Sequence, residues 1–538
     1  MAPFLKILWF PTLLFFTFSQ SLPAQVSIPH IEWAKSFGGS SIDLPQCIEQ
    51  TVDKGYIIAG MSYSDDVDIA GHHGATDTWD YWIVKLDSNG NLEWQRSLGG
   101  NGNEIANNIK QTSDGGYIVA GSSDASGGDV SVNHGKEDYW IVKLDNNGAI
   151  IWQKSYGGSG SDKASCIELT SDGGYIVAGS SFSTDGDVTN HHGSTDSADY
   201  WIVKLNPAGK LEWQKSFGGT GDDEAYSIKE ISHDGFIITG FSNSINGDIT
   251  GNHGNEDYWI VKLDIAGNLI WQKSLGGSGT DVSYSIDVTA DGGFVAAGYS
   301  NSNNGNVSDN HGQEDFWIAK LDSIGTLQWQ KSLGGSQLDA AYSIRQTFDG
   351  GYIVAGNTAS NDGDVSGNHG GKTGTNDFWV VKLNHEGSIL WQKTLGGSDE
   401  DYALCIRQTS DSGYVITGSS LSSDSDVKVN RGFEDFWVVK LGFSSKSGVL
   451  QAEKSSHNTG RNYPNPFSRQ TTILFNESLQ SRSSLILYDL LGRQVQQILI
   501  PEGSTSLTLN RNELTSGVYV YRVVSEGAVF VTGNIIIQ

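Results

Sequence analysis

Two sets of residues, each recurring seven times along the chain, have side chains that could bind a cation or a ligand. The first set is an acidic residue directly before a short apolar run, at Asp43, Glu104, Asp162, Asp223, Asp281, Asp339 and Asp401. Carboxylates supply the hard oxygen ligands that calcium prefers, and at turns they accept backbone hydrogen bonds instead. We favour the second role, with calcium binding and direct contact with a ligand as the alternatives.

The second set is a loop motif, Asp-Val/Ile-x-x-Asn/His-His-Gly. Its histidines are His73, His134, His192, His253, His311 and His369, and its acidic residues are Asp68, Asp129, Asp187, Asp248, Asp364 and Asp426. Histidine and carboxylate at a fixed spacing can hold a metal, for which the candidates are Asp129 with His134, Asp187 with His192, Asp248 with His253, and Asp364 with His369. Asn306 and Arg431 interrupt the motif in two copies. A shared metal site should not tolerate such changes, so we favour a structural role in which Asp and His bond backbone groups.

Both sets belong to a repeat of roughly 60 residues, which must position them. One tryptophan of the repeat lies at Trp33, Trp94, Trp152, Trp213, Trp271, Trp329 and Trp391, and another at Trp82, Trp140, Trp201, Trp259, Trp317, Trp379 and Trp437. Within each repeat, short runs rich in β-branched and aromatic residues alternate with Asp, Gly, Asn and Ser clusters, which predicts four strands. No stretch keeps apolar residues at helical spacing. A series of such units predicts a propeller.

The two ends of the repeat region complement each other. The chain enters at residues 31–36 with a fourth strand and leaves the repeats at residues 436–441 with a third strand. We therefore predict an all-β fold with a seven-bladed β-propeller over residues 25–442, built of four-stranded blades and closed by the N-terminal strand. Residues 443–461 read as a linker, and the short alternating strands of residues 462–538 predict a small β-sandwich.

Composition and the N-terminus limit the possible partners. The formal net charge of −28 and the pI near 4.6 argue against nucleic acid, because phosphate binding needs a clustered basic surface. Residues 1–24 combine Lys6, an apolar run and a small-residue cleavage point, which predicts a signal peptide. No later segment is apolar enough to span a bilayer, so we expect no transmembrane span in the mature chain.

Three cysteines, Cys47, Cys166 and Cys405, take the same place in the first strand of three repeats. We interpret them as small residues that face a crowded axis. The repeats of Cys47 and Cys405 would be neighbours in a closed ring, and an oxidising compartment would permit a disulfide between them. Equivalent positions of inner strands are, however, expected to lie too far apart for disulfide geometry.

The C-terminal residues carry a more specific pattern. It comprises Tyr463, Pro464, Asn465, Pro466 and Phe467, then Gly492 in a Tyr-Asp-x-x-Gly-Arg-x-Val stretch, then Gly517 and Tyr519 in Leu-x-x-Gly-Val-Tyr-x-Tyr. This tail resembles the type A C-terminal sorting domain of proteins exported by the type IX secretion system of Bacteroidetes-like bacteria. The resemblance implies passage through the periplasm, recognition of residues 462–538 by the outer-membrane translocon, and a final location that is secreted or at the cell surface. The chain departs from the family in lacking a lysine after Gly533.

No catalytic residue can be assigned from the sequence. Gly-x-Ser-x-Gly, His-Glu-x-x-His and phosphate-loop motifs are missing, and no site stands out against the repeat symmetry as an active site should. We therefore favour a multivalent binding or adhesion module, with extracellular polysaccharide as the preferred ligand class and calcium as the one cofactor considered. The alternative is a secreted polysaccharide-degrading hydrolase, similar to an endoglucanase, since one carboxylate pair could serve that reaction.

Overall fold

The protein is described from a computed structural model. The structure describes residues 27–443, except residues 76, 233 and 371–373, and most of residues 461–537. In the latter stretch the gaps are residues 464, 466, 476–477, 480–482, 489–493, 512–513, 515–516 and 526–527. The predicted signal peptide and nearly all of the predicted linker lie outside the described residues. The chain divides into two compact units, Met1–Ser444 and Ser445–Gln538, and each is described by itself.

The first unit contains seven antiparallel sheets of four strands, which we call blades 1 to 7. Blade 1 is β2 (Asp43–Gln50), β3 (Tyr56–Ser62), β4 (Asp80–Leu86) and β5 (Leu92–Leu98), and blade 2 is β6 (Glu104–Gln111), β7 (Tyr117–Ser123), β8 (Asp138–Leu144) and β9 (Ile150–Tyr156). Blade 3 is β10 (Asp162–Leu169), β11 (Tyr175–Ser181), β12 (Asp199–Leu205) and β13 (Leu211–Phe217), and blade 4 is β14 (Asp223–Glu230), β15 (Phe236–Ser242), β16 (Asp257–Leu263) and β17 (Leu269–Leu275). Blade 5 is β18 (Asp281–Val288), β19 (Phe294–Ser300), β20 (Asp315–Leu321) and β21 (Leu327–Leu333), and blade 6 is β22 (Asp339–Gln346), β23 (Tyr352–Thr358), β24 (Asp377–Leu383) and β25 (Ile389–Leu395). Blade 7 is β26 (Asp401–Gln408), β27 (Tyr414–Ser420), β28 (Asp435–Gly442) and the N-terminal β1 (His30–Phe37).

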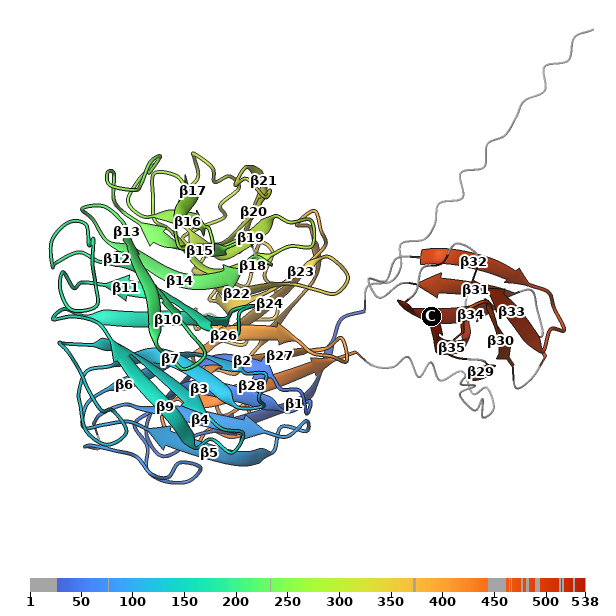
Figure 1. Ribbon diagram of the computed structural model, residues 1–538, viewed down its shortest axis with the longest axis horizontal. Coiled ribbons are helices and arrows are strands. Elements are labelled where there is room, and N and C mark those ends of the chain that lie inside the picture. Colours follow the sequence, from blue (N-terminus) through green and yellow to red (C-terminus); the bar gives the residue numbers. More distant parts are fainter. Residues whose placement is uncertain are drawn as a thin grey trace, which may run out of the picture. The chain divides into compact units, whose positions relative to one another are not determined.

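Blade 7 joins the two ends of the repeat region. Strand β1 pairs antiparallel with β28, from His30 opposite Gly442 to Phe37 opposite Phe436. In Figure 1 the blue β1 accordingly lies beside the orange strands of the same sheet. The prediction of a seven-bladed propeller closed by its N-terminal strand is confirmed.

Aromatic contacts hold neighbouring blades together. The Tyr258 hydroxyl donates to the Trp317 carbonyl at 2.6 Å, and the two rings lie 4.4 Å apart between their centroids. The equivalent ring contacts are Tyr81 with Trp140, Tyr139 with Trp201, Tyr200 with Trp259, Phe316 with Trp379, Phe378 with Trp437, and Phe436 with Trp82. The last of these joins blade 7 to blade 1, so the repeated Tyr/Phe-Trp pair of the third strand closes the ring as well as filling the core.

The first strand of every blade carries a β-bulge near its middle. A bulge sets two residues of one strand against one of its partner. In blade 4 the bulge lies at Tyr226, and both Tyr226 and Ser227 line the central channel as a result. Gly240 on the partner strand fits this geometry, because a Cβ atom there would overlap the Glu224 carbonyl.

The second unit is a small β-sandwich, as predicted. One sheet contains β29 (Arg461–Tyr463), β30 (Gln470–Leu474) and β33 (Ser506–Asn510), and the other contains β32 (Gln494–Ile500), β31 (Ser483–Tyr488), β34 (Gly517–Ser525) and β35 (Ala528–Ile537). Ile473 and Leu509 of the first sheet pack with Leu485, Tyr521 and Ile535 of the second in one buried core. Within the described ranges of the whole chain there is no helix long and apolar enough to cross a membrane.

Candidate functional site

The seven acidic residues singled out in the sequence each begin the first strand of a blade, and none has exposed surface. At Asp281, Oδ2 accepts the Gly277 N–H at 2.7 Å and the Ser302 hydroxyl at 2.9 Å, while Oδ1 accepts the Ser300 hydroxyl. A glycine N–H bonds the equivalent carboxylate in every blade. The carboxylates thus fasten the loops between blades, and a ligand in the channel could not reach them unless these loops moved.

Each of these carboxylates lies next to a second buried carboxylate across a blade junction. In blade 4, Asp257 begins the third strand, and its Oδ1 and Asp281 Oδ2 both lie 2.6 Å from where a Cβ atom on Gly276 would be. The equivalent pairs are Asp435 with Asp43, Asp80 with Glu104, Asp138 with Asp162, Asp199 with Asp223, Asp315 with Asp339, and Asp377 with Asp401. We call these seven pairs the junction carboxylates. Only the first-strand member of each pair was predicted from the sequence.

The histidines of the loop motif bind the third-strand aspartates. Asp257 Oδ2 accepts the His253 N–H at 2.9 Å and lies 2.6 Å from His253 Nδ1. The same contacts join His73 to Asp80, His134 to Asp138, His192 to Asp199, His311 to Asp315, and His369 to Asp377. In the described part of the chain, Oδ1 of all seven third-strand aspartates is buried without a hydrogen-bond partner.

The acidic residue of the loop motif forms hydrogen bonds at the junction with the preceding blade. Asp248 Oδ2 accepts the Gly218 N–H at 3.2 Å and lies 3.7 Å from Nε2 of His192, which belongs to the preceding blade. Asn306 makes the same bond through Oδ1 to the Gly276 N–H at 3.2 Å, which explains why an amide can replace the acid. Among the described residues, no ion pair joins a histidine to the acid of its own motif. The candidate metal pairs are therefore not brought together. Each histidine contacts the third-strand aspartate of its own blade, and His73, His192 and His369 also lie 3.8, 3.7 and 4.0 Å from the motif aspartate of the next blade.

Arg431, which replaces the histidine in the seventh motif, lies where the ring closes. Its backbone N–H donates to Asp435 Oδ2 at 2.6 Å, so it keeps the loop contact of the histidines. Its guanidinium forms an ion pair with Asp68 of blade 1. The longer and permanently charged side chain thus links the last blade to the first.

Calcium remains a testable occupant of the junctions. Across the residues that the structure describes, no group of three or more His, Cys, Asp and Glu side chains is placed to hold a metal ion. Calcium takes about six to eight oxygen ligands, whereas each junction offers two carboxylates that already accept hydrogen bonds. We expect calorimetry to give the same melting temperature in calcium and in excess chelator. A lower melting temperature in chelator would assign the junction carboxylates to calcium binding.

Burial perturbs the junction carboxylates. It raises the pKa of Glu104, Asp223 and Asp401 to about 7 and that of Asp339 to about 6, although hydrogen bonds from the loops oppose the shift. It also raises the pKa of Asp435 to about 6. A carboxyl group that keeps a proton near neutral pH removes one of the two buried negative charges at its junction.

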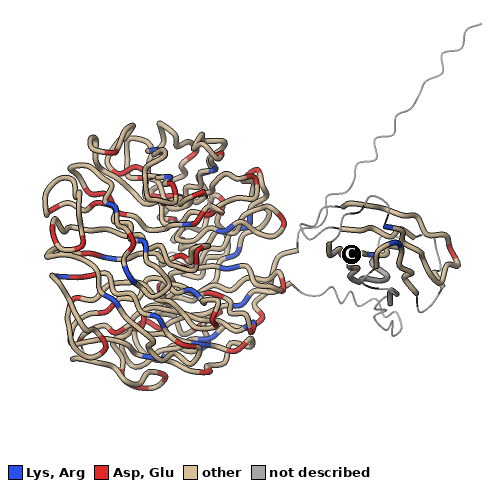
Figure 2. Tube along the Cα trace, in the orientation of Figure 1, with Lys and Arg blue, Asp and Glu red and all other residues tan. Residues whose placement is uncertain are grey.

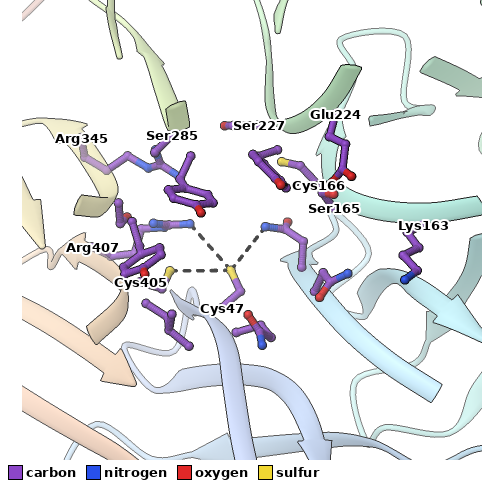
Figure 3. A pocket seen from close by; sticks show the side chains of 18 of the residues that line it. Cys47, Lys163, Ser165, Cys166, Glu224, Ser227, Ser285, Arg345, Cys405 and Arg407 are labelled. Carbon is purple, nitrogen blue, oxygen red and sulfur yellow. Dashed lines mark hydrogen bonds between the residues drawn. The ribbon is translucent and has the colours of Figure 1, made fainter. Parts of the chain in front are cut away.

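The central channel holds a cavity of about 380 Å³. Two complete layers of first-strand side chains line it, one residue from each blade in each layer. The first layer is Gln46, Asn107, Ser165, Tyr226, Tyr284, Tyr342 and Leu404, and the second is Cys47, Asn108, Cys166, Ser227, Ser285, Ser343 and Cys405. Lys163, Glu224, Arg345 and Arg407 also line it, as Figure 3 shows. We call this space the channel cavity.

One side of the channel cavity is aromatic and the other is polar. Tyr226, Tyr284 and Tyr342 come from three successive blades, and their ring centroids are 4.9 Å apart from one ring to the next. We call these three residues the tyrosine wall. Burial raises the pKa of all three hydroxyls, so they remain protonated donors at neutral pH. Gln46 and Asn107, from blades 1 and 2, line the same layer of the cavity.

Two of the cysteines meet in this cavity. The Sγ atoms of Cys47 and Cys405 lie 3.8 Å apart across the junction of blades 1 and 7, and both thiols are free. Arg407 Nη2 donates to Cys47 Sγ at 3.7 Å. The dashed lines around Cys47 in Figure 3 mark these contacts. The three cysteines occupy the small-residue layer next to the axis, in keeping with their interpretation from sequence.

The expectation that no site breaks the repeat symmetry is wrong for the channel cavity. Its first layer changes around the ring, with tyrosine in three successive blades and other residues in the remaining four, although the motifs on either side of it repeat. The break is hidden when whole motifs are compared, because the motifs that flank this position repeat in every blade. A comparison of the seven first strands position by position would reveal the change from Gln46 and Asn107 to three successive tyrosines.

Part of the sorting motif falls in the described β-sandwich. Phe467 is buried and pairs with Ile537, Tyr519 is buried in the core, and Gly517 begins β34. Asn465 is exposed. Pro464, Pro466 and Gly492, together with the side chain of Tyr463, lie outside the described residues.

Comparison with known families identifies the C-terminal unit. Residues 461–538 match the family described as the secretion system C-terminal sorting domain. This confirms the resemblance stated from sequence: the chain is cargo of type IX secretion, and its destination is the cell surface or the medium. Recognition by the secretion machinery follows from the same match.

The remaining similarities are weaker. The regulatory protein FlaEY of Caulobacter vibrioides is 26% identical over 249 residues, which cover 42% of this chain and 25% of that protein. The chain therefore spans about a quarter of that relative. A fungal alcohol oxidase in complex with copper aligns with 14% identity and a TM-score of 0.42, covering 95% of this chain and 100% of the other. The WD40 domain of Neurospora crassa Pan2 aligns with 11% identity and a TM-score of 0.42, covering 77% and 96%. These scores are low, so the fold assignment rests on the seven sheets themselves.

Proposed function

We propose that this exported propeller is a binding module that takes an extracellular saccharide in its channel cavity. The proposal rests mainly on the tyrosine wall, because at this position three successive blades have tyrosine and the other four blades do not. A ligand bound in one central cavity is contacted by different side chains from different blades, whereas binding at seven equivalent loops would require no difference between the blades. The volume of about 380 Å³ falls within the range of small-molecule sites.

The chemistry of the cavity suits sugars. Aromatic rings present flat apolar faces that can lie against the C–H face of a pyranose. Tyr226, Tyr284 and Tyr342 are half-buried and offer such faces to the cavity. Amide side chains such as Gln46 and Asn107 can donate to and accept from sugar hydroxyls. The junction carboxylates, which the multivalent version of this function would use, are buried and bonded to loops. A single site in the channel is therefore favoured over seven shallow ones.

Binding is favoured over hydrolysis by the composition of the cavity lining. Glycoside hydrolysis uses two carboxyl groups placed on either side of the scissile bond. Among the described residues that line the channel cavity, Glu224 is the one carboxylate. The hydrolase alternative would need a second acid from elsewhere.

The test is a screen of the purified protein against an array of oligosaccharides and polysaccharides, with calcium and with chelator. Affinity for any glycan that binds should fall about tenfold or more in Tyr284→Ala, through loss of the stacking face. Phe348→Ala is the matched control, because Phe348 is an exposed aromatic residue outside the cavity. Equal losses in both variants, or no binding to any glycan, would contradict the proposal. Release of shortened products would instead favour the hydrolase.

A further inference from the structure

A layer of charged residues lies beyond the cysteine and serine layer of the channel. One residue of each first strand contributes to it: Glu49, Lys110, Glu168, Lys229, Asp287, Arg345 and Arg407. Lys110 Nζ lies 3.3 Å from Glu49 and 3.5 Å from Glu168, and Lys229 also pairs with Glu168. The four residues from blades 1 to 4 therefore satisfy one another.

The two arginines, from blades 6 and 7, are different. In the described part of the chain neither forms an ion pair with a carboxylate. Arg345 Nη1 donates to the Ile344 carbonyl at 2.6 Å and to the Ser285 hydroxyl at 3.1 Å. Arg407 uses Nη1 for the Ile406 carbonyl at 2.8 Å and Nη2 for Cys47 Sγ. A guanidinium has five N–H groups, so both side chains keep donors that no described residue uses.

Both guanidinium groups line the channel cavity, and Figure 3 shows them extending into it from adjacent blades. The charged lining consists of Lys163, Arg345 and Arg407 with Glu224. Lys163 is paired with Glu137 at 3.1 Å, so the two arginines are the cationic lining groups without an ion pair among the described residues. The chain as a whole has a net charge of −28, and its acidic and basic residues are otherwise interspersed (Figure 2). Two arginines side by side in a cavity of so acidic a protein are an unusual local arrangement. Glu168 acts electrostatically on both of them and Glu49 on Arg407, but neither carboxylate forms an ion pair with a guanidinium, which leaves room for a ligand carboxylate to do so.

We infer that the channel cavity binds an acidic saccharide, whose carboxylate pairs with Arg345 and Arg407 while its sugar ring lies against the tyrosine wall. The inference rests on the proposed function and deepens it by naming the ligand class. Guanidinium groups match carboxylates in a planar, two-pronged geometry, and such charge-assisted bonds are stronger than neutral ones. The wall and the arginines line the same cavity, since Tyr342 and Arg345 both belong to β22.

The experiment uses oligomers of galacturonic, glucuronic and mannuronic acid, each compared with its methyl ester. Esterification removes the charge and leaves the sugar ring unchanged. Isothermal titration of the purified protein should show the acid form binding about tenfold or more tightly than the ester for at least one oligomer. The double variant Arg345→Gln/Arg407→Gln should lose this preference. The control Arg96→Gln removes the same charge from β5, the outermost strand of blade 1, and should keep it.

The outcomes separate the two proposals. Equal affinity for acid and ester, with binding lost in Tyr284→Ala, would overturn the acidic class and leave the saccharide site standing. No binding of either form by any oligomer would overturn the acidic class, and neutral glycans on the array would then decide the saccharide site. If the double variant does not fold, Arg407→Gln alone should still reduce the preference, and an unchanged preference there would count against the carboxylate contact.

Discussion

The purified protein should melt at a clearly higher temperature at about pH 5.5 than at about pH 8. The reason is the set of junction carboxylates, whose burial raises the pKa of Glu104, Asp223 and Asp401 to about 7. In the unfolded chain the same groups titrate near their ordinary values, close to 4. Folding therefore takes up protons between these two limits, and one proton per pair relieves the repulsion of two buried negative charges.

The direction follows from linkage. A carboxyl group whose pKa is raised in the folded state contributes stability that is fully present below its unfolded pKa and is lost as the pH rises through its folded pKa. The loss should accordingly begin above about pH 4, where the unfolded chain gives up these protons. It should be complete about one unit above the folded pKa values, which are about 6 for Asp339 and Asp435 and about 7 for Glu104, Asp223 and Asp401. Several junctions act together, so the summed effect should be large for a single domain.

Stability should fall again in strong acid, for the opposite reason. Thr112 and Lys143 lower the pKa of Asp114 to about 2, and Lys110 and Lys229 lower that of Glu168 to about 2 against the effect of burial. Groups with lowered pKa values lose their contribution as the pH falls through the folded value. The optimum is thus expected on the acid side of neutrality, below the range in which the junctions lose their protons.

The variant Asp401→Asn tests the cause. It removes one negative charge from the pair with Asp377 and supplies an N–H donor, so it should raise the melting temperature at pH 8 and flatten the profile. Asp399→Asn makes the same charge change at an exposed position of the same loop and is the control. The histidines bound to the third-strand aspartates remain in both variants, so the difference between the two profiles isolates the junction. A wild-type profile that is flat from pH 5.5 to 8 would contradict proton uptake by the junction carboxylates.

The fold could be predicted because the same pattern of four strands occurs seven times in the sequence. The third-strand tryptophans and the turn glycines recur with the same period. The repeat region begins with a fourth strand and ends with a third strand, and β1 pairs with β28 as this arrangement requires. The aromatic contact of Phe436 with Trp82 could not be placed from sequence, since it depends on how one blade packs on the next.

The candidate site was harder to predict, for two physical reasons. The acidic residues were recognised, but burial at a junction depends on a partner such as Asp257, which lies 24 residues from Asp281 along the chain and belongs to another blade. The channel cavity could not be predicted from the repeats, because its lining consists of different residues at equivalent positions of the blades, and a repeat pattern contains only what the blades share. The bulge also matters, because it turns two consecutive residues, such as Tyr226 and Ser227, toward the axis.

Substitution of one junction glycine should be among the most damaging single changes in the propeller. A Cβ atom on Gly276 would lie 2.6 Å from Asp257 Oδ1 and 2.6 Å from Asp281 Oδ2. Neither oxygen can withdraw easily, because His253 holds the first carboxylate and the Gly277 N–H holds the second. We expect Gly276→Ala to lower the free energy of unfolding by about 3 kcal/mol, near the upper end for overpacking a core.

Gly292→Ala separates this packing effect from backbone strain. Gly292 has a φ of +80° and no heavy atom within 4 Å of its would-be Cβ, so alanine there is strained but not crowded. Gly276 lies outside the positive-φ region, so alanine there is crowded but not strained. The control should cost about 1–2 kcal/mol, and both changes alter the unfolded chain alike. Urea unfolding of the two variants gives the comparison. If Gly276→Ala proves no more harmful than Gly292→Ala, the junction carboxylates are free to move apart, and the close pairing on which the pH dependence rests would have to be abandoned.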